Sequence, residues 1–135
     1  MKVGDRASIT RAYTAADLAL YRDLAGLPAD TVLAHVPEPL IGGLFSYLLG
    51  AELPGFGTNY LKQDLRFLRP APADGPLTAT VEITRIRPDK HLVDLATTCT
   101  DAHGTLVCDG RALVLVKDVG HGQQRQETKQ GSADA

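Results

Sequence analysis

Two kinds of hydrophobic spacing divide the chain into a helical first part and a second part made of strands. Up to about residue 50 the apolar side chains recur at helical spacing. After Gly57 they alternate with polar side chains at a period of two. This change of period predicts helices followed by a sheet, which is an α+β arrangement.

The first predicted helix is TAADLALYRDLAG, residues 14–26, and an extended arm, ASITRAYT at 7–14, precedes it. Thr14 can cap this helix, and Asp17 stands three residues later in the capping-box position. Gly26 suits the C-terminal stop. The pattern therefore predicts an arm and a short helix before the first loop.

The second predicted helix lies within EPLIGGLFSYLLG, with Pro39 in its first turn and Gly50 at its end. Apolar residues occur on every side of it, which is typical of a buried helix. Gly42 and Gly43 each weaken a helix by roughly 1 kcal/mol relative to Ala. We therefore expect another group to approach the backbone at this point.

Four long strands follow, joined in part by short turns. They are predicted at TNYLKQDLRFL (58–68), PLTATVEITRI (76–86), HLVDLATTCT (91–100) and TLVCDGRALVLVK (105–117). The turns RPDK and DAHG join the last three as antiparallel hairpins. One sheet with a single apolar face needs a cover, and the apolar helix supplies it. The expected fold is a single hot-dog domain, an antiparallel sheet wrapped around a central helix.

Composition narrows the function classes further. The chain has 135 residues, a net charge of −2, 5% aromatic residues and no Trp, so no nucleic-acid partner is expected. No apolar run could span a membrane and no secretory signal is visible, so we expect a cytoplasmic protein. Cys99 and Cys108 fit a reduced compartment and suggest no metal site. The domain is predicted to cover residues 1–118, with a disordered tail at 119–135.

The segment LFSYLLGAELPGFGTNYLKQDLRFLRP, residues 44–70, resembles the MaoC-like dehydratases, and most closely the (R)-specific enoyl-CoA hydratases. The likeness extends over nearly all of residues 3–117. It implies a lyase, a hydratase or dehydratase of fatty acid or polyketide metabolism. The implied partners are an acyl-CoA or acyl-carrier-protein thioester and a second copy in a homodimer, whose edge pairing would also protect the sheet. No cofactor is implied beyond the CoA or phosphopantetheine of the substrate.

The same resemblance suggests a catalytic pair. In the family, a loop D-x-N-P-x-H after the first helix holds and activates the water. Asp30 and His35 keep the Asp-to-His spacing in the stretch DTVLAH, although the loop is shortened and the Asn-Pro pair is missing. An imidazole that titrates near neutrality and a carboxylate that orients it are suited to moving the protons of a hydration.

The family also suggests an oxyanion donor and a pocket. In PLIGGL, Gly43 takes the place of the family's oxyanion-hole glycine, which would give its backbone N–H at a helix N-terminus to the thioester oxygen. Gly42 replaces the histidine usually found before that glycine. The predicted substrate-binding residues are Gly42, Ser46, Leu49, Gln63 and Arg66.

Some of these residues have simpler interpretations. Gln63 interrupts an apolar row, and it either faces the substrate or holds a loop by hydrogen bonds. Lys62, Arg66 and Arg69 could meet the phosphates of CoA or phosphopantetheine, or they could only make the surface soluble. Gly43 could serve close packing of the helix on the sheet.

Other functions remain open on this fold. The helix interior LIGGLFSYLL has no acid, which disfavours a thioesterase. The altered loop keeps two further alternatives: a diverged protein that binds acyl thioesters without hydrating them, and an enzyme of a specialised biosynthetic pathway that performs another reaction.

Overall fold

The computed structural model describes residues 1–120, so the predicted tail lies outside the described residues from position 121 on. The elements, in chain order, are β1 (Arg6–Arg11), α1 (Ala15–Leu24), β2 (His35–Val36), α2 (Glu38–Tyr47), the π-helical turn η1 (Leu48–Glu52), β3 (Asn59–Phe67), β4 (Ala71–Pro72), β5 (Leu77–Arg87), the 3-10 turn η2 (Pro88–Lys90), β6 (Leu92–Thr100) and β7 (Leu106–Leu115). Both predicted helices and all predicted strands are present.

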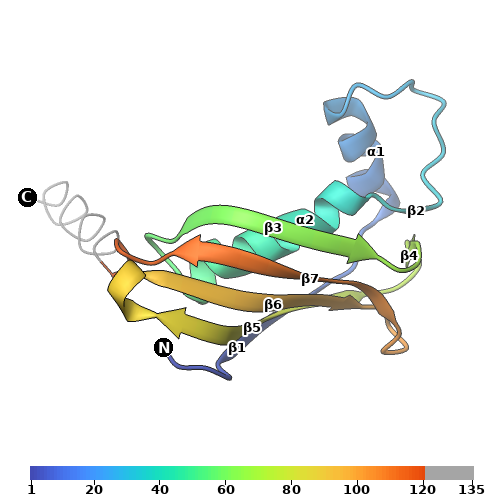
Figure 1. Ribbon diagram of the computed structural model, residues 1–135. Coiled ribbons are helices and arrows are strands. Elements are labelled where there is room, and N and C mark those ends of the chain that lie inside the picture. Colours follow the sequence, from blue (N-terminus) through green and yellow to red (C-terminus); the bar gives the residue numbers. More distant parts are fainter. Residues whose placement is uncertain (121–135) are drawn as a thin grey trace, which may run out of the picture.

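Five strands form one antiparallel sheet in the order β1-β5-β6-β7-β3, and α2 lies along one face of it (Figure 1). The predicted hairpins β5–β6 and β6–β7 are confirmed. The hydrophobic pattern did not predict that β1 pairs with β5 or that β3 pairs with β7. A separate two-stranded ladder, β2 with β4, lies at the N-terminal end of α2.

The core lies between α2 and the sheet. The buried positions of α2 and η1 are Ile41, Leu44, Phe45, Leu48 and Leu49, and they share one cluster with the inward residues of β5, β6 and β7. The opposite face of the helix, with Gly43, Ser46 and Tyr47, is exposed. The prediction of a helix buried on every side is therefore wrong for a single chain, because the sheet covers only one side of it.

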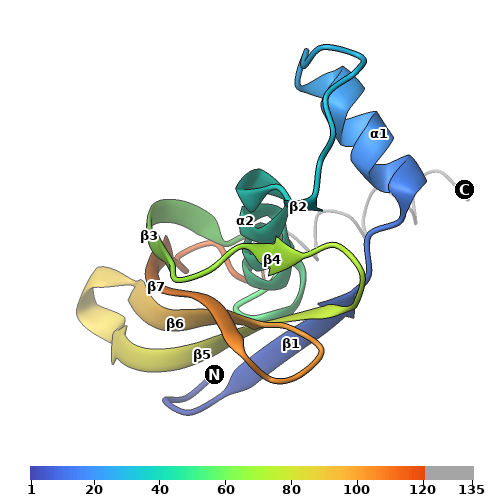
Figure 2. The same ribbon diagram turned by 90° about the vertical axis from the view of Figure 1, so that its right-hand side faces the viewer.

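The first helix stands away from the sheet (Figure 2). Its predicted capping box is confirmed, since Thr14 accepts from the Asp17 N–H and the Asp17 carboxylate accepts from the Thr14 N–H. However, α1 buries no residue, and Leu20, Leu24 and Val32 of α1 and its loop are all exposed. Helix α1 and the loop to β2 therefore form an arm beside the body of the protein.

A polar group of residues fixes the edge strand β3. The Gln63 amide donates to the Asp64 carbonyl at 2.7 Å and to the Thr97 hydroxyl at 3.0 Å, and it accepts from the Tyr60 hydroxyl. Gly110 is on β7, which lies between β3 and β6, and it is opposite Leu65 on β3 and Thr97 on β6. Glycine is needed there, because a Cβ would lie within 3.0 Å of the β3 backbone around Asp64.

Two cysteines face one another inside the sheet. Cys99 on β6 and Cys108 on β7 are directly opposite in the register, and both are free and fully buried. Within residues 1–120 no helix is long and apolar enough to cross a bilayer, and no group of three or more His, Cys, Asp or Glu side chains could hold a metal ion.

Candidate active site

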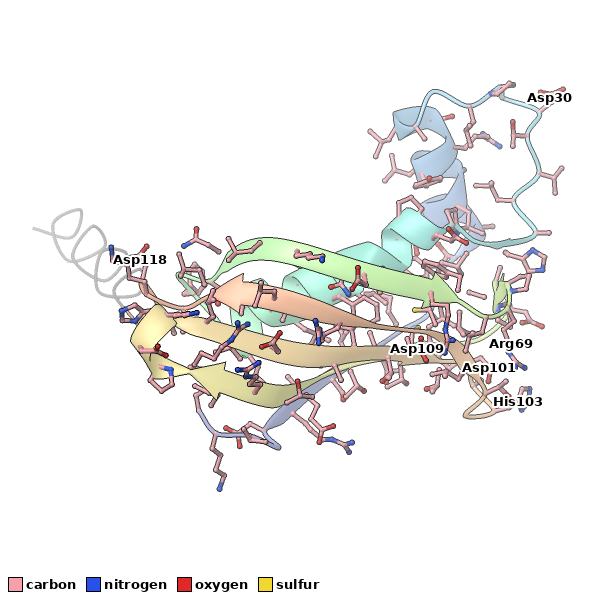
Figure 3. All side chains as sticks on the ribbon, in the orientation of Figure 1. Asp30, Arg69, Asp101, His103, Asp109 and Asp118 are labelled. Atoms are coloured by element: carbon pink, nitrogen blue, oxygen red, sulfur yellow. The ribbon has the colours of Figure 1, made fainter. Side chains whose placement is uncertain are left out.

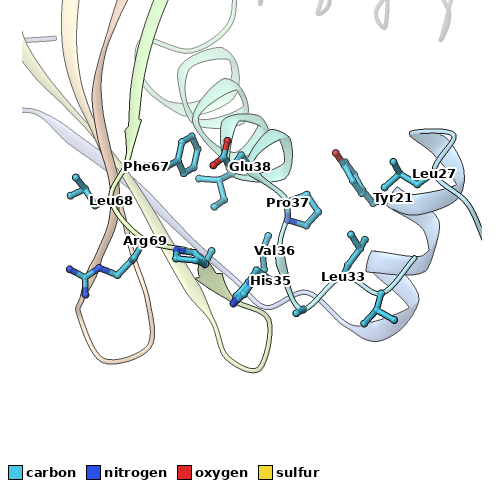
Figure 4. A pocket seen from close by; sticks show the side chains of 15 residues that line it. Tyr21, Leu27, Leu33, His35, Val36, Pro37, Glu38, Phe67, Leu68 and Arg69 are labelled. Atoms are coloured by element: carbon cyan, nitrogen blue, oxygen red, sulfur yellow. The ribbon is translucent and has the colours of Figure 1, made fainter. Parts of the chain in front are cut away.

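A cavity lies where α2 begins. This main cavity, about 680 Å³, is enclosed by the arm, by β2, by the first turn of α2 and by the segment from the end of β3 to β4 (Figure 4). Its lining residues are Tyr21, Leu27, Val32, Leu33, Ala34, His35, Val36, Pro37, Glu38, Ile41, Phe67, Leu68, Arg69, Pro70 and Ala71. The walls are mostly apolar with a few polar groups, which is typical of a small-molecule site.

His35 is the imidazole of this cavity. It pairs with Pro72 across the β2–β4 ladder and is exposed rather than packed in the core. It also lines a second, side cavity of about 630 Å³, together with Tyr13 and Asp74. The ladder therefore places His35 between two openings, where a ligand can reach it from either side.

The first turn of α2 offers a free backbone donor. Pro37 and Pro39 have no N–H, and the Leu40 N–H donates to the Pro37 carbonyl at 3.0 Å. The Glu38 N–H has no hydrogen-bond partner among the described residues, and Glu38 lines the main cavity. The positive end of the helix dipole adds to the attraction of this donor for an oxygen that carries negative charge.

Gly43 does not occupy the position predicted for it. It is the sixth residue of α2, beyond the first turn, where amides are used in the i to i−4 ladder of the helix. The resemblance assigned the donor to Gly43, although Pro39 was already expected in the first turn, and the helix begins at Glu38. The N-terminal donor is therefore Glu38, not Gly43.

The structure does not bring Asp30 and His35 together. Asp30 is exposed at the far end of the loop, pointing away from the body of the protein (Figure 3), and it lines neither cavity. The chain from Thr31 to Ala34 has no helical turn that would fold it back, and five residues of extended chain span up to about 16 Å. The expected spacing is present in the sequence, but it does not produce a pair in space.

The other predicted binding residues also lie outside the main and side cavities. Gly42 is in the interior of α2, Ser46 is on its exposed face, and Leu49 is in the core. The Gln63 amide donates to the Asp64 carbonyl on β3 and to the Thr97 hydroxyl on β6, so its hydrogen bonds lie within the sheet and not at a loop. Arg66 forms an ion pair with Asp109 at 3.1 Å and is mostly exposed.

Two charged residues that line the cavity, Glu38 and Arg69, were absent from the predicted site. The acid in the sequence PEP, residues 37–39, at the start of the helix was the available signal for Glu38. Arg69 was named only as a member of a basic cluster with Lys62 and Arg66, and of these three only Arg69 lines the main cavity. The pKa of the Asp101 carboxyl lies below its usual value. The main cause is the hydrogen bond that Asp101 accepts from the Thr105 N–H. A second bond from the His103 N–H and the charges of His103 and Arg69 act in the same direction.

A curved antiparallel sheet around one central helix, with a cavity at the start of that helix, defines a hot-dog protein. No family model matches the chain. Curated relatives do: it is 37% identical over 131 residues to the (R)-specific enoyl-CoA hydratase of Rhodospirillum rubrum, covering 86% of this chain and 88% of that protein. It is 33% identical to the (R)-specific enoyl-CoA hydratase of Aeromonas caviae, covering 84% and 94%.

Solved structures agree with these relatives. The (R)-hydratase of A. caviae matches with a TM-score of 0.76 at 34% identity, covering 84% of this chain and 96% of that one. An R-hydratase of Pseudomonas aeruginosa in its unliganded form matches with a TM-score of 0.76 at 31% identity, covering 85% and 81%. The chain belongs to the (R)-specific enoyl-CoA hydratase family.

Proposed function

We propose that this protein adds water to the α,β double bond of an enoyl thioester, or removes it from a 3-hydroxyacyl thioester. The observation that carries the proposal is His35, which lines the same apolar cavity as the free amide of a helix N-terminus. The named activities of the relatives, which match over more than four fifths of this chain, support the same reaction.

The chemistry follows from these two groups. The imidazole can accept a proton from water and return one to the α-carbon, as general acid–base catalysis requires. The Glu38 N–H can hold the thioester oxygen while negative charge develops on it. The apolar walls around Val36, Ile41 and Phe67 suit an acyl chain, and Arg69 is placed to meet a phosphate of CoA or of a carrier-protein arm. The reaction needs no cofactor beyond the thioester itself.

The test is a hydration assay with crotonyl-CoA and longer enoyl-CoAs, following the loss of the enoyl absorbance. The His35→Ala variant should lose roughly 100-fold or more in kcat, within the usual range for a general acid or base. Asp30→Asn is the matched control and should stay within about twofold of wild type, because Asp30 lies outside the cavity. A wild type that hydrates no enoyl thioester, or a His35→Ala variant with full activity, would overturn the proposal.

A second function is favoured by one observation, the separation of Asp30 from His35. A cavity that binds the thioester without an acid–base pair would make the protein an acyl-thioester binder. Titration calorimetry with crotonyl-CoA distinguishes the two functions. Binding without turnover supports the binder, and turnover supports the hydratase.

We also propose that the chain forms a homodimer in the cytoplasm. β3 is an edge strand of nine residues, and Tyr60 and Leu61 on it are exposed, as is the neighbouring outer face of α2. Pairing of β3 with the same strand of a second copy would cover both surfaces. The free thiols of Cys99 and Cys108 support a reducing compartment.

A further inference from the structure

The arm, made of α1 and the loop to β2, supplies one apolar wall of the main cavity. Tyr21 on α1 and Leu27, Val32 and Leu33 on the loop line the cavity on this side. Leu27 is 38% exposed and Val32 is 87% exposed, so part of this wall faces solvent. Apolar side chains that face solvent inside a cavity are suited to an apolar ligand.

The arm is held at its base. The Tyr13 hydroxyl, just before α1, donates to the Leu40 carbonyl of α2 at 3.4 Å, and at the other end of the arm β2 pairs with β4. Between these two points no residue is buried. The Leu27 N–H donates to the Arg22 carbonyl at 3.0 Å and closes the turn after α1, where Gly26 adopts a φ of 72°. These bonds place the apolar wall of the arm beside the first turn of α2.

The opposite wall of the cavity is already packed. Val36, Ile41 and Ala71 line the cavity, but each is at most 4% exposed because it belongs to the core cluster. Protein cores are close-packed, so a ligand could extend into this wall only by displacing core side chains. Room for a longer apolar ligand is therefore on the side of the arm.

Charge lies at the far end of the cavity from the arm. Arg69, after β3, is the one Lys or Arg among the described residues that line the main cavity. In Figure 4, Arg69 lies at one end and the arm residues Tyr21 and Leu33 at the other, with Glu38 between them. The Glu38 N–H is the free backbone donor of the helix start. The cavity thus presents a cation, then a hydrogen-bond donor, then an apolar wall.

An acyl thioester carries matching groups in the same order: phosphate, thioester carbonyl and acyl chain. With the carbonyl oxygen on the Glu38 N–H and the phosphate end toward Arg69, the acyl chain is directed toward the arm. The chain of a crotonyl thioester ends soon after the carbonyl. A longer chain continues to the wall formed by Leu27, Val32 and Leu33.

We propose that the arm selects the acyl chain, and that Leu27, Val32 and Leu33 bind the distal carbons of enoyl thioesters longer than crotonyl. This inference rests on the proposed hydratase function and specifies its substrate class. Each methylene group that leaves water for such a wall contributes up to roughly fourfold in affinity. The protein therefore prefers an enoyl thioester of medium chain length to a crotonyl thioester, and the arm is the origin of this preference.

The experiment measures kcat/KM for crotonyl-CoA and for trans-2-octenoyl-CoA in the hydration assay. Leu27→Ser and Leu33→Ser should each lower the ratio of the octenoyl to the crotonyl value by about tenfold, because a polar side chain replaces apolar contact with the distal carbons. Leu20→Ser and Leu24→Ser are the matched controls. Both leucines are exposed on the same arm but line none of the described cavities, so the ratio should stay within about twofold of wild type.

Several results would overturn the inference while the hydratase function stands. They are a wild type that prefers crotonyl-CoA, equal losses for both substrates in Leu27→Ser and Leu33→Ser, and control variants that change the ratio as much. Circular dichroism of each variant excludes unfolding as the cause of a loss.

A wild type that hydrates neither substrate overturns the proposed function, and the role of the arm is then decided by titration calorimetry with octanoyl-CoA. Binding about tenfold weaker in Leu33→Ser than in wild type supports the arm as the acyl-chain site. Equal binding by the two proteins overturns it. A Leu33→Ser variant that changes only the mass in light scattering assigns the wall to a second copy and also overturns the inference.

Discussion

Gly110 holds the edge strand β3 in place, and the substitution Gly110→Ala tests this directly. A Cβ at Gly110 would lie 2.9 Å from the Asp64 carbonyl carbon and 3.1 Å from Leu65 Cα, with the Asp64 carbonyl oxygen closer still. These are backbone atoms, so no side-chain rotation can relieve the overlap. The strand itself would have to move.

The magnitude follows from the hydrogen bonds that such a movement breaks. A displacement of roughly 1 Å carries the nearest β3–β7 ladder bonds beyond the usual donor–acceptor distance of about 2.7–3.2 Å. Two lost ladder bonds and the strained Gln63–Thr97 bond, at about 1 kcal/mol each, sum to about 3 kcal/mol. For a chain of this size that corresponds to a fall in Tm of roughly 10 °C.

The assay is thermal and urea unfolding followed by circular dichroism, with Gly43→Ala as the control. An added Cβ at Gly43 meets no atom within 4 Å, and a helix-interior alanine is more stable than glycine by about 0.5–1 kcal/mol. Gly43→Ala should therefore keep or raise the free energy of unfolding of the monomer. A Gly110→Ala variant within about 1 kcal/mol of wild type would refute the account of the β3–β7 contact.

Three further predictions concern the sheet, its edge and a turn. Asp94 is buried and pairs with Arg87 at 3.0 Å, so Asp94→Asn should lower the free energy of unfolding in urea by about 1–3 kcal/mol; an unchanged urea midpoint would contradict this. Leu61→Lys should convert a dimer to a 14.4 kDa monomer in light scattering after gel filtration, and an unchanged mass would show that β3 is not the dimer edge. The lowered pKa of Asp101 stabilises the folded state above the usual carboxyl pKa of about 4, and this contribution disappears as pH falls through the lower folded-state value. Wild type should therefore have a higher Tm than Asp101→Asn at pH 7, and the difference should vanish in strong acid; a constant difference would refute the linkage.

The period of the hydrophobic pattern was enough to predict the helices and strands, because burial on one face of a sheet imposes alternation. It could not predict that β3 would pair with β7, since that pairing depends on contacts between residues distant in the chain. Gly110 illustrates the limit. Position 110 requires glycine because the backbone of Asp64 on the neighbouring strand β3 leaves no room for a side chain. Nothing near Gly110 in the sequence indicates this contact.

The site was predicted less well than the fold. His35 lines the cavity, but its predicted partner Asp30 does not, because a fixed spacing in a loop sets no distance in space. Gly43 was assigned as the donor by resemblance to the family, whereas the helix begins five residues earlier, at Glu38. Glu38 had a usable signal, an acid at the first position of the helix that enters the core.

The two buried cysteines give this protein a built-in reporter of its own motion. Hydrogen bonding from the Cys108 thiol to Cys99, together with burial, raises the pKa of Cys108, and neither side chain is accessible to solvent. A thiol reagent can therefore react only when β6 and β7 separate or the whole domain opens. Since the sequence contains no other cysteine, the rate of labelling in the native protein measures how often this part of the sheet opens, without any added probe.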